Sequence, residues 1–240
     1  MTSAEIKYVK SLSQKKFRDQ YGVFAVEGEK MVREALASSF EVEKVYRTSE
    51  IGEAVMSRIS SLSSPSPALA VVRKPEDLHK ADVPSKGLFL ALDGIRDPGN
   101  LGTILRIADW FGIDAVYASE DTVDVFNPKV VQATMGAIFR VKFHYAHIPS
   151  LCKDAASRGA KVYGTFLDGE NLYQKRLESG FSLIVIGNEA NGISPATASC
   201  VTDRLFIPPY PADAPGSESL NAAVATAVTV AEFRRVSALH

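Results

Sequence analysis

From Gly87 to Pro208 the chain repeats one pattern, in which a short apolar run is followed by a longer amphipathic segment. Most of the runs lack polar residues at alternate positions, which is typical of parallel strands covered on both faces. The segments between them predict helices beginning near Leu101, Asn127, Ser150 and Pro195, with a closing helix from about Ser219. The pattern therefore predicts a doubly wound α/β domain. The expected strands are GLFLALD (87–93), AVYAS (115–119), FRVKFHY (139–145), KVYGTF (161–166), FSLIVIG (181–187) and DRLFIP (203–208).

A smaller α/β segment precedes this pattern. Strands are predicted at 23–28, 42–49 and 68–72, and helices at 29–38 and near 51–60. The polar stretch KPEDLHKADVPSKG (74–87) contains two prolines and is interpreted as the connection between domains. We therefore expect an accessory domain over residues 1–84 and a larger domain over residues 85–240.

Composition excludes several classes of protein. The net charge of −1 indicates no global basic field, although a local basic patch is enough to bind nucleic acid. Cys152 and Cys200 fit no metal-ligand or disulfide spacing, so we expect two buried thiols in a reducing cytosol and no metal. No run approaches the ~20 apolar residues of a membrane helix, and the N-terminus lacks the apolar core of a signal peptide. The sequence thus predicts a soluble cytoplasmic protein.

The stretch ALDGIRDPGNLGTILRIADWFG (91–112) joins a predicted strand to a helix through a glycine-spaced turn. No lysine stands in the turn, which excludes the phosphate-binding loop G-x-x-x-x-G-K-[ST]. Gly99 and Gly102 supply only the second half of the dinucleotide fingerprint G-x-G-x-x-G. The remaining interpretation is a turn with Asn100 placed to cap the following helix.

That helix is predicted to present an arginine away from the core. Apolar residues at 101, 104, 105 and 108 have the spacing of a buried face. Thr103, Arg106 and Trp110 fall on a different face. From this segment alone, Arg106 is either a functional residue or a solvated surface arginine.

Two later stretches favour the functional interpretation. LIVIGNEANGIS (183–194) runs from a buried strand into a glycine-bounded acidic turn. LFIPPYPADAPGSESLNAAVATAVTVAEF (205–233) runs from a strand through a proline-rich loop into a helix that is apolar nearly all round. Such a helix is expected to be buried against its own sheet and against another subunit.

Together with 91–112, these stretches resemble the three signature motifs of the SpoU/TrmH family of RNA 2′-O-ribose methyltransferases, within the SPOUT superfamily. NPKVVQATMGAIFRV (127–141) also resembles the family's helix after the second strand, so the resemblance covers about 88–235. The N-terminal part resembles the family's accessory substrate-binding domain, an α/β fold related to ribosomal RNA-binding proteins. The resemblance implies the cofactor S-adenosylmethionine, a deep trefoil knot, and a homodimer whose sites are completed across the subunit interface.

The resemblance also implies roles for individual residues. Accounts of the family often make this arginine the base, but a guanidinium is a poor proton acceptor at neutral pH. Arg106 is therefore expected to anchor an RNA phosphate and to stabilise the developing alkoxide. Asn100 is expected to orient Arg106 or the 2′-hydroxyl. Glu189 pairs with Arg106 or holds the second motif's turn, and Ser219 and Asn221 bind the target nucleotide or stabilise the knot.

The cofactor is expected on the knot loops, held largely by backbone groups. The residues that the resemblance assigns to this site are Thr165, Gly187, Ile207, Pro209 and Leu220, and ordinary core packing is the alternative for the apolar ones. The Ile207–Ser219 loop is longer than in many relatives, so its contacts with the cofactor are not copied from them.

RNA binding is expected to fall first to the basic N-terminal segment. Phosphates are assigned to Lys15, Lys16, Arg18, Lys30 and Arg33, although a solvated helix face would account for the same residues. An RNA-binding module without catalysis and a SPOUT enzyme that methylates a base are the competing interpretations. Ribosomal and transfer RNA both remain open, and the accessory domain favours ribosomal RNA.

Overall fold

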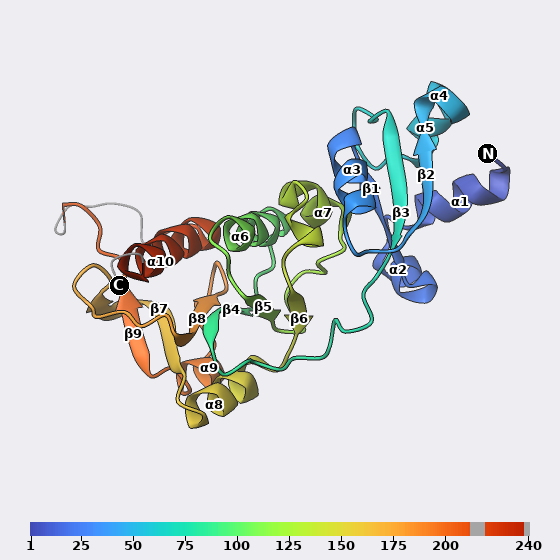
Figure 1. The fold of residues 1–240 in the computed structure, drawn as a ribbon. Coiled ribbons are helices and arrows are strands. Elements are labelled where there is room, and N and C mark those ends of the chain that lie inside the picture. The colour runs from blue at the N-terminus through green and yellow to red at the C-terminus, as the bar shows by residue number, and fades with distance from the viewer. Residues whose placement is uncertain (212–218, 238–240) are drawn as a thin grey trace. The chain divides into compact units, whose positions relative to one another are not determined.

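The computed structural model describes residues 1–211 and 219–237. The chain forms two compact units (Figure 1). The first contains Met1–Glu76 together with Asp124–Arg140, and the second contains Asp77–Val123 and Val141–His240. The chain therefore leaves the second unit after residue 123, adds one segment to the first unit, and returns at residue 141.

The first unit is built on an antiparallel sheet with the strand order β1-β3-β2. Its core contains Ile6 and Val9 of the first helix, with Met56 and Ile59 from a later one. These positions are spaced three apart, which places each pair on one helix face. The elements are α1 (Ser3–Ser11), α2 (Lys15–Tyr21), β1 (Val23–Glu27), α3 (Glu29–Ala37), β2 (Val42–Arg47), α4 (Thr48–Ile51), α5 (Glu53–Ile59) and β3 (Ala68–Arg73).

The segment Asp124–Arg140 completes the first unit with α7 (Pro128–Thr134) and the short helix η1 (Ala137–Phe139). Val130, Val131 and Thr134 form the buried face of α7. The ring of Phe126 lies 4.5 Å from that of Phe24 on β1, measured between centroids. Aromatic packing therefore attaches this segment to the N-terminal sheet.

The second unit contains a parallel sheet with the strand order β6-β5-β4-β8-β7-β9 in the described part of the chain. Five consecutive residues of β4, from Leu88 to Leu92, are buried, as are six of β8. These continuous runs confirm the prediction of strands covered on both faces. The strands are β4 (Gly87–Asp93), β5 (Ala115–Ala118), β6 (Phe143–Tyr145), β7 (Lys161–Asn171), β8 (Phe181–Gly187) and β9 (Asp203–Phe206).

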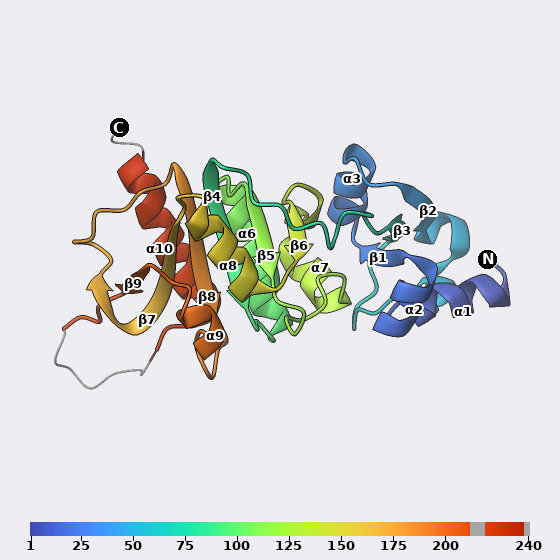
Figure 2. The ribbon, with the colours of Figure 1, turned by 90° about the horizontal axis from the view of Figure 1, so that it is seen from below.

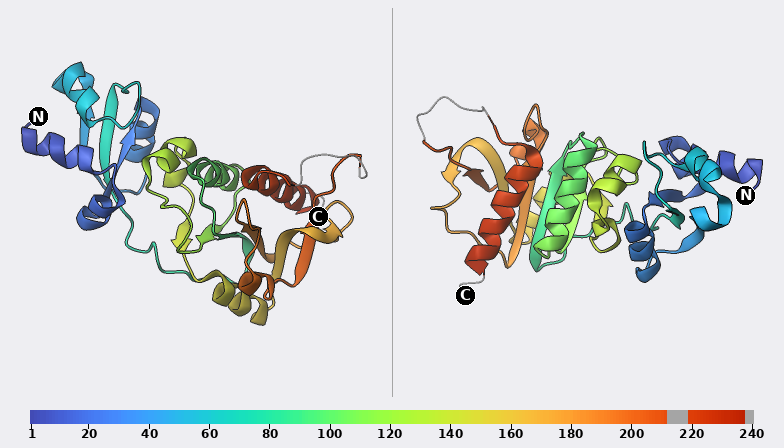
Figure 3. Two further views of the ribbon diagram at one scale, coloured as in Figure 1. Left: turned by 180° about the vertical axis from the view of Figure 1, so that it is seen from behind. Right: turned by 90° about the horizontal axis from the view of Figure 1, so that it is seen from above.

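Helices lie on both faces of this sheet, as predicted for a doubly wound domain (Figures 2 and 3). α6 (Pro98–Trp110) and α10 (Ala222–Ser237) pack side by side on one face. α8 (Ile148–Ser157) and α9 (Pro195–Ala198) lie on the other face.

Several expected elements have different bounds in the structure. The expected strand at 139–145 is only β6, because residues 137–139 form η1. β7 continues past Phe166 to Asn171, and its pairing with β9 shifts register between Thr165 and Glu170. The last helix begins at Ala222 instead of Ser219. The longer β7 follows from its pairing with β9, and the later start of α10 follows from Asn221, whose side chain accepts the Ala223 N–H at 2.9 Å as a helix cap.

Candidate functional site

The predicted motif residues meet where parallel strands of the second unit end. β4 ends at Asp93, which is paired in register with Gly187 at the end of β8. The chain connects β4 to β5 on one side, whereas β8 lies on its other side. Such a switch point is where open α/β sheets bind ligands. The Asp93 carboxylate accepts a hydrogen bond from the Ser194 backbone N–H at 2.8 Å, which ties the two motif turns together.

The second motif folds back tightly onto its own strand. Asn188 and Gly192 form an antiparallel bridge, with N–H···O distances of 2.9 Å in both directions. A Cβ atom on Gly187 would lie 2.2 Å from the Gly192 carbonyl carbon and from the Ile193 nitrogen. No side chain fits at that distance, so the turn requires glycine at position 187.

In the first motif, Asp97 determines where the helix α6 begins. α6 begins at Pro98, and the Asp97 carboxylate accepts the Asn100 N–H at 2.8 Å as the N-cap. The prediction that Asn100 caps the helix is therefore wrong. Proline is favoured at the first helical position and aspartate at the cap, so the helix begins one turn earlier than expected. This frees the side chain of Asn100, which is only 9% exposed, for other contacts.

Asn100 joins the three motifs through two hydrogen bonds. Its amide nitrogen donates to Glu189 Oε1 at 2.9 Å, and its Oδ1 accepts from the Asn221 amide nitrogen at 2.8 Å. Asn221 Oδ1 accepts the Ala223 N–H at 2.9 Å and therefore caps α10. A carboxylate only accepts and helix N–H groups only donate, so both amide orientations are determined. This relay runs from the α10 N-terminus to the Glu189 carboxylate.

Glu189 holds the two turns together and makes no contact with Arg106 among the described residues. Its carboxylate also accepts the Arg96 and Asp97 backbone N–H groups, at 3.4 Å each. Of the two roles considered for Glu189, the observed contacts match the one that holds the turn.

Arg106 lies on the exposed face of α6 with Thr103 and Trp110, as the helical spacing predicts. The predicted core face at 101, 104, 105 and 108 is at most 1% exposed. In the part of the chain that the structure describes, the Arg106 guanidinium has neither an ion-pair partner nor a hydrogen-bond acceptor. It is therefore available to an external anion.

Of the candidate cofactor residues, Thr165 lies within β7, Gly187 ends β8, Ile207 and Pro209 follow β9, and Leu220 precedes α10. Thr165 Oγ1 donates to the Val185 carbonyl at 3.4 Å, and Gly187 is buried. Ile207 is half-buried, Pro209 is exposed, and Leu220 is 49% exposed. Residues 212–218 of the Ile207–Ser219 loop lie outside the described residues, whereas Ser219 itself is described and exposed.

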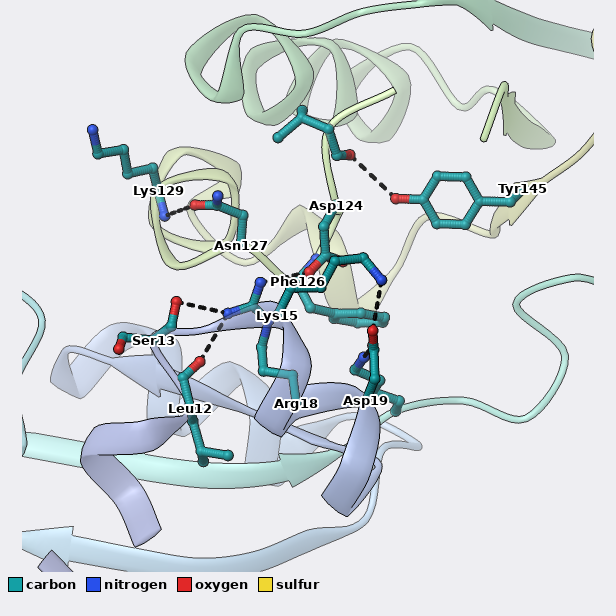
Figure 4. Close-up of polar contacts among 12 residues, drawn as sticks. Leu12, Ser13, Lys15, Arg18, Asp19, Asp124, Phe126, Asn127, Lys129 and Tyr145 are labelled. Atoms are coloured by element: carbon teal, nitrogen blue, oxygen red, sulfur yellow. Dashed lines mark hydrogen bonds and ion pairs between the residues drawn. The ribbon is translucent and has the colours of Figure 1, made fainter. Parts of the chain in front are cut away.

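The candidate RNA-binding residues divide into two kinds. Lys15, Lys16, Lys30 and Arg33 are exposed, and Lys15 pairs with Asp19 at 2.6 Å. Arg18 is only 2% exposed, so its assignment to phosphate binding is corrected. Its guanidinium contacts Asp124 Oδ2 at 2.6 and 3.2 Å and donates to the Leu12 and Ser13 carbonyls at 2.9 Å each (Figure 4).

Sequence reasoning missed Asp93, Asp97 and Asn188. The Asn188 side chain donates to the Gly94 carbonyl at 2.6 Å and accepts the Ala190 N–H at 2.9 Å. Asp-Pro before a helix is a readable cap signal, so Asp97 could have been found. The other two contacts join distant segments and have no local signal.

Three other titratable groups of the second unit have pKa values shifted by burial or by ion pairing. Burial raises the pKa of the Cys152 thiol to about 12 and that of the Tyr117 hydroxyl to about 12. Hydrogen bonds to Asp203 and Glu170 raise the pKa of Lys175, which braces the segment after β7. Both cysteines are buried and free, as predicted. No three His, Cys, Asp or Glu side chains of the described residues gather as metal ligands would.

No helix formed by the described residues has the length and apolar character that a membrane crossing requires.

Two family models match the chain. The SpoU rRNA methylase family matches residues 87–231, which contain the first two motif stretches and all but the last two residues of the third. An MRM3-like substrate binding domain matches residues 3–60.

Individual proteins resemble the chain over nearly its whole length. The 23S rRNA (guanosine(2553)-2′-O)-methyltransferase RlmP of Bacillus subtilis is 31% identical over 96% of both chains. A TrmH-family structure from Porphyromonas gingivalis is 38% identical, with a TM-score of 0.87 and 98% of both chains covered. An AdoMet-bound rRNA methyltransferase from Sinorhizobium meliloti is 28% identical, with a TM-score of 0.87 over 98% of this chain and 95% of that one.

Proposed function

The chain belongs to the SpoU rRNA methylase family, and we propose that it transfers a methyl group from S-adenosylmethionine to one ribose 2′-hydroxyl of ribosomal RNA. The relay of Glu189, Asn100 and Asn221 is the observation that carries this proposal. It joins all three motif segments at the carboxyl edge of the parallel sheet. The RlmP relative, named as a ribosomal RNA 2′-O-methyltransferase, supports ribose over base and ribosomal RNA over transfer RNA.

The residues at this edge fit the proposed cofactor. Leu220 and Pro209 expose apolar surface beside strand ends, where an adenine ring or a methionine chain can cover it. Thr165 supplies backbone groups from the point where the register of β7 against β9 shifts, and Gly187 and Ile207 supply them at the ends of β8 and β9. The bound cofactor supplies an electrophilic methyl group on a sulfonium.

Arg106 is proposed to bind the RNA phosphate next to the target ribose and to stabilise negative charge on its 2′-oxygen. Its guanidinium faces outward without an internal partner among the described residues. A guanidinium stays protonated at neutral pH, so the hydroxyl proton leaves to phosphate or water. Asn100 positions the α6 N-terminus, and Ser219 contacts the target nucleotide.

The working form is proposed to be a cytoplasmic homodimer with a deep trefoil knot near the cofactor loops. Val224 of α10 is 48% exposed, and Val228 and Ala231 lie on the same face of this helix, four and seven residues farther along. On the neighbouring α6, Trp110 is 86% exposed. Apolar side chains on adjacent helices are typical of a subunit interface, which would place Arg106 near the partner. Residues 1–84 are proposed as the accessory domain and residues 85–240 as the catalytic domain, whose segment Asp124–Arg140 packs within the first unit.

A catalytically inert RNA-binding protein is the rival from another class. The intact relay argues against it, because an inert module has no need for three matched polar side chains at one edge. Mapping ribose methylation across total RNA, from cells with and without the gene, tests both. We expect one or very few sites to disappear in the deletion and Arg106→Ala to leave them unmethylated. Full methylation with Arg106→Ala would refute the role of Arg106, and an unchanged map in the deletion would refute the activity.

A further inference from the structure

The segment Asp124–Arg140 is attached to the first unit by several independent contacts. Arg18 pairs with Asp124, and Phe24 packs on Phe126 (Figure 4). Farther along, Glu34 of α3 forms an ion pair with Arg140. The segment lies within the match to the methylase family, but its contacts make it part of the N-terminal body.

A hollow of about 320 Å³ lies in this body, between α7 and the loop after α5. Leu62, Pro128 and Ala133 supply apolar surface and are half-buried. Ser61, Lys129 and Gln132 supply the polar groups, and no lining residue is acidic. Lys129 is exposed and makes no ion pair with any described residue.

Both walls of the hollow are held by strand β1. Glu27, only 6% exposed, accepts hydrogen bonds from Ser60 Oγ at 2.5 Å and from the Ser61 N–H at 2.7 Å. On the other side, Phe24 holds α7 through Phe126. The two sides of this open hollow are therefore each attached to β1.

The lining suits an unstacked nucleobase. Proteins recognise single-stranded RNA by stacking splayed bases, usually on aromatic rings or guanidinium planes, and by hydrogen bonding to their edges. The hollow offers aliphatic surface in place of an aromatic ring. Here apolar side chains can cover the faces, and the Gln132 amide can both donate and accept at the edge. Lys129 adds a cation for the adjoining phosphate. Lys30 is exposed and lies one helical turn before Glu34 on the same side of α3.

We propose that the hollow between α7 and the Ser60–Leu62 loop binds one unpaired nucleotide of the RNA substrate, with the base against Leu62, Pro128 and Ala133 and its phosphate at Lys129. The RNA-reading surface would then extend beyond the matched substrate-binding domain at residues 3–60 to a helix from within the methylase segment. Because α7 belongs to the first unit and forms one side of the hollow, RNA bound there would contact α7 directly.

Two variants with matched controls test the site in the full-length protein, with transcribed 23S ribosomal RNA as the probe. Ala133→Phe fills the hollow, and Ala54→Phe places the same ring on the exposed side of α5. Lys129→Glu reverses the charge at the rim, and Lys153→Glu makes the same change on α8. Circular dichroism checks folding, and calorimetry with S-adenosylmethionine checks the catalytic unit separately.

We expect Ala133→Phe to raise the Kd for RNA roughly 5-fold, the lower end of what one stacked base contributes, because the lining is aliphatic and not aromatic. Lys129→Glu is expected to weaken binding and to lower the slope of log Kd against log salt by about 0.7. The controls should stay within about twofold, and ultraviolet crosslinks should map to the peptide containing residues 128–133. The proposal is overturned if folded Ala133→Phe and Lys129→Glu proteins bind like the parent, or if crosslinks avoid this peptide.

Discussion

Removing the Asp124 carboxylate is predicted to destabilise the first unit strongly. The Arg18 side chain is 2% exposed and that of Asp124 is 11% exposed, so Asp124→Ala leaves a buried guanidinium without its counter-charge. Breaking a buried ion pair from one side costs about 3–5 kcal/mol. Arg18 keeps the Leu12 and Ser13 carbonyls at 2.9 Å, so we expect the lower part of that range, about 3 kcal/mol.

Native-state hydrogen exchange measures this loss locally. The amides of β3 are buried in the centre of the sheet and report the full opening of the first unit. A loss of about 3 kcal/mol accelerates their exchange roughly 100-fold, since each 1.4 kcal/mol is a factor of ten. The amides of α7 should accelerate at least as much, because Asp124 precedes that helix.

Two further variants test whether the loss of stability is specific to the buried ion pair or follows from removing any charge. Lys15→Met removes the exposed pair with Asp19, which contributes at most about 1 kcal/mol. The double variant Arg18→Met, Asp124→Leu removes both buried charges and should recover most of the stability lost by Asp124→Ala. If the amides of β3 and α7 exchange no faster in Asp124→Ala than in Lys15→Met, the Arg18–Asp124 pair does not hold the segment Asp124–Arg140 in place.

Three further predictions concern the second unit. Gly187→Ala should abolish calorimetric binding of S-adenosylmethionine, because its Cβ would lie 2.2 Å from backbone atoms and the motif turn must move; binding at parental affinity would contradict this. Asn221→Asp should lower methylation at least about tenfold while RNA binding persists, because a carboxylate cannot donate a hydrogen bond to Asn100 Oδ1. Asn221→Ala, which removes the side-chain amide altogether, serves as the control. Parental activity in Asn221→Asp would show that the relay is not needed for methylation. Cys152 should resist thiol reagents in the native protein and react after unfolding, because it is fully buried and its pKa is raised to about 12; rapid labelling of the native protein would show that the helix α8 opens.

Local sequence patterns predicted most of the second unit because its strands and helices follow strong periodicities. The strands at 87–93 and 181–187 match β4 and β8 residue for residue. The core face of α6 and the outward position of Arg106 also follow from spacing alone. Partners across the sheet were not predictable in this way. Asp93 holding Ser194 and Asn188 holding Gly94 depend on strand order, which no single segment encodes.

Arg18 marks the limit of reading residues one at a time. The local sequence places Arg18 in a basic helix beside other lysines, so the sequence alone predicted a contact with phosphate. Only the tertiary structure decided otherwise, because Asp124, 106 positions along the chain, reaches the same buried site. The sequence by itself determined the parallel α/β sheet, the exposed face of α6 and the order of the motifs, since these depend on local periodicity and residue type. The tertiary structure decided that residues 124–140 join the N-terminal body and that Asn100 lies between Glu189 and Asn221, since both result from contacts between segments far apart in the chain.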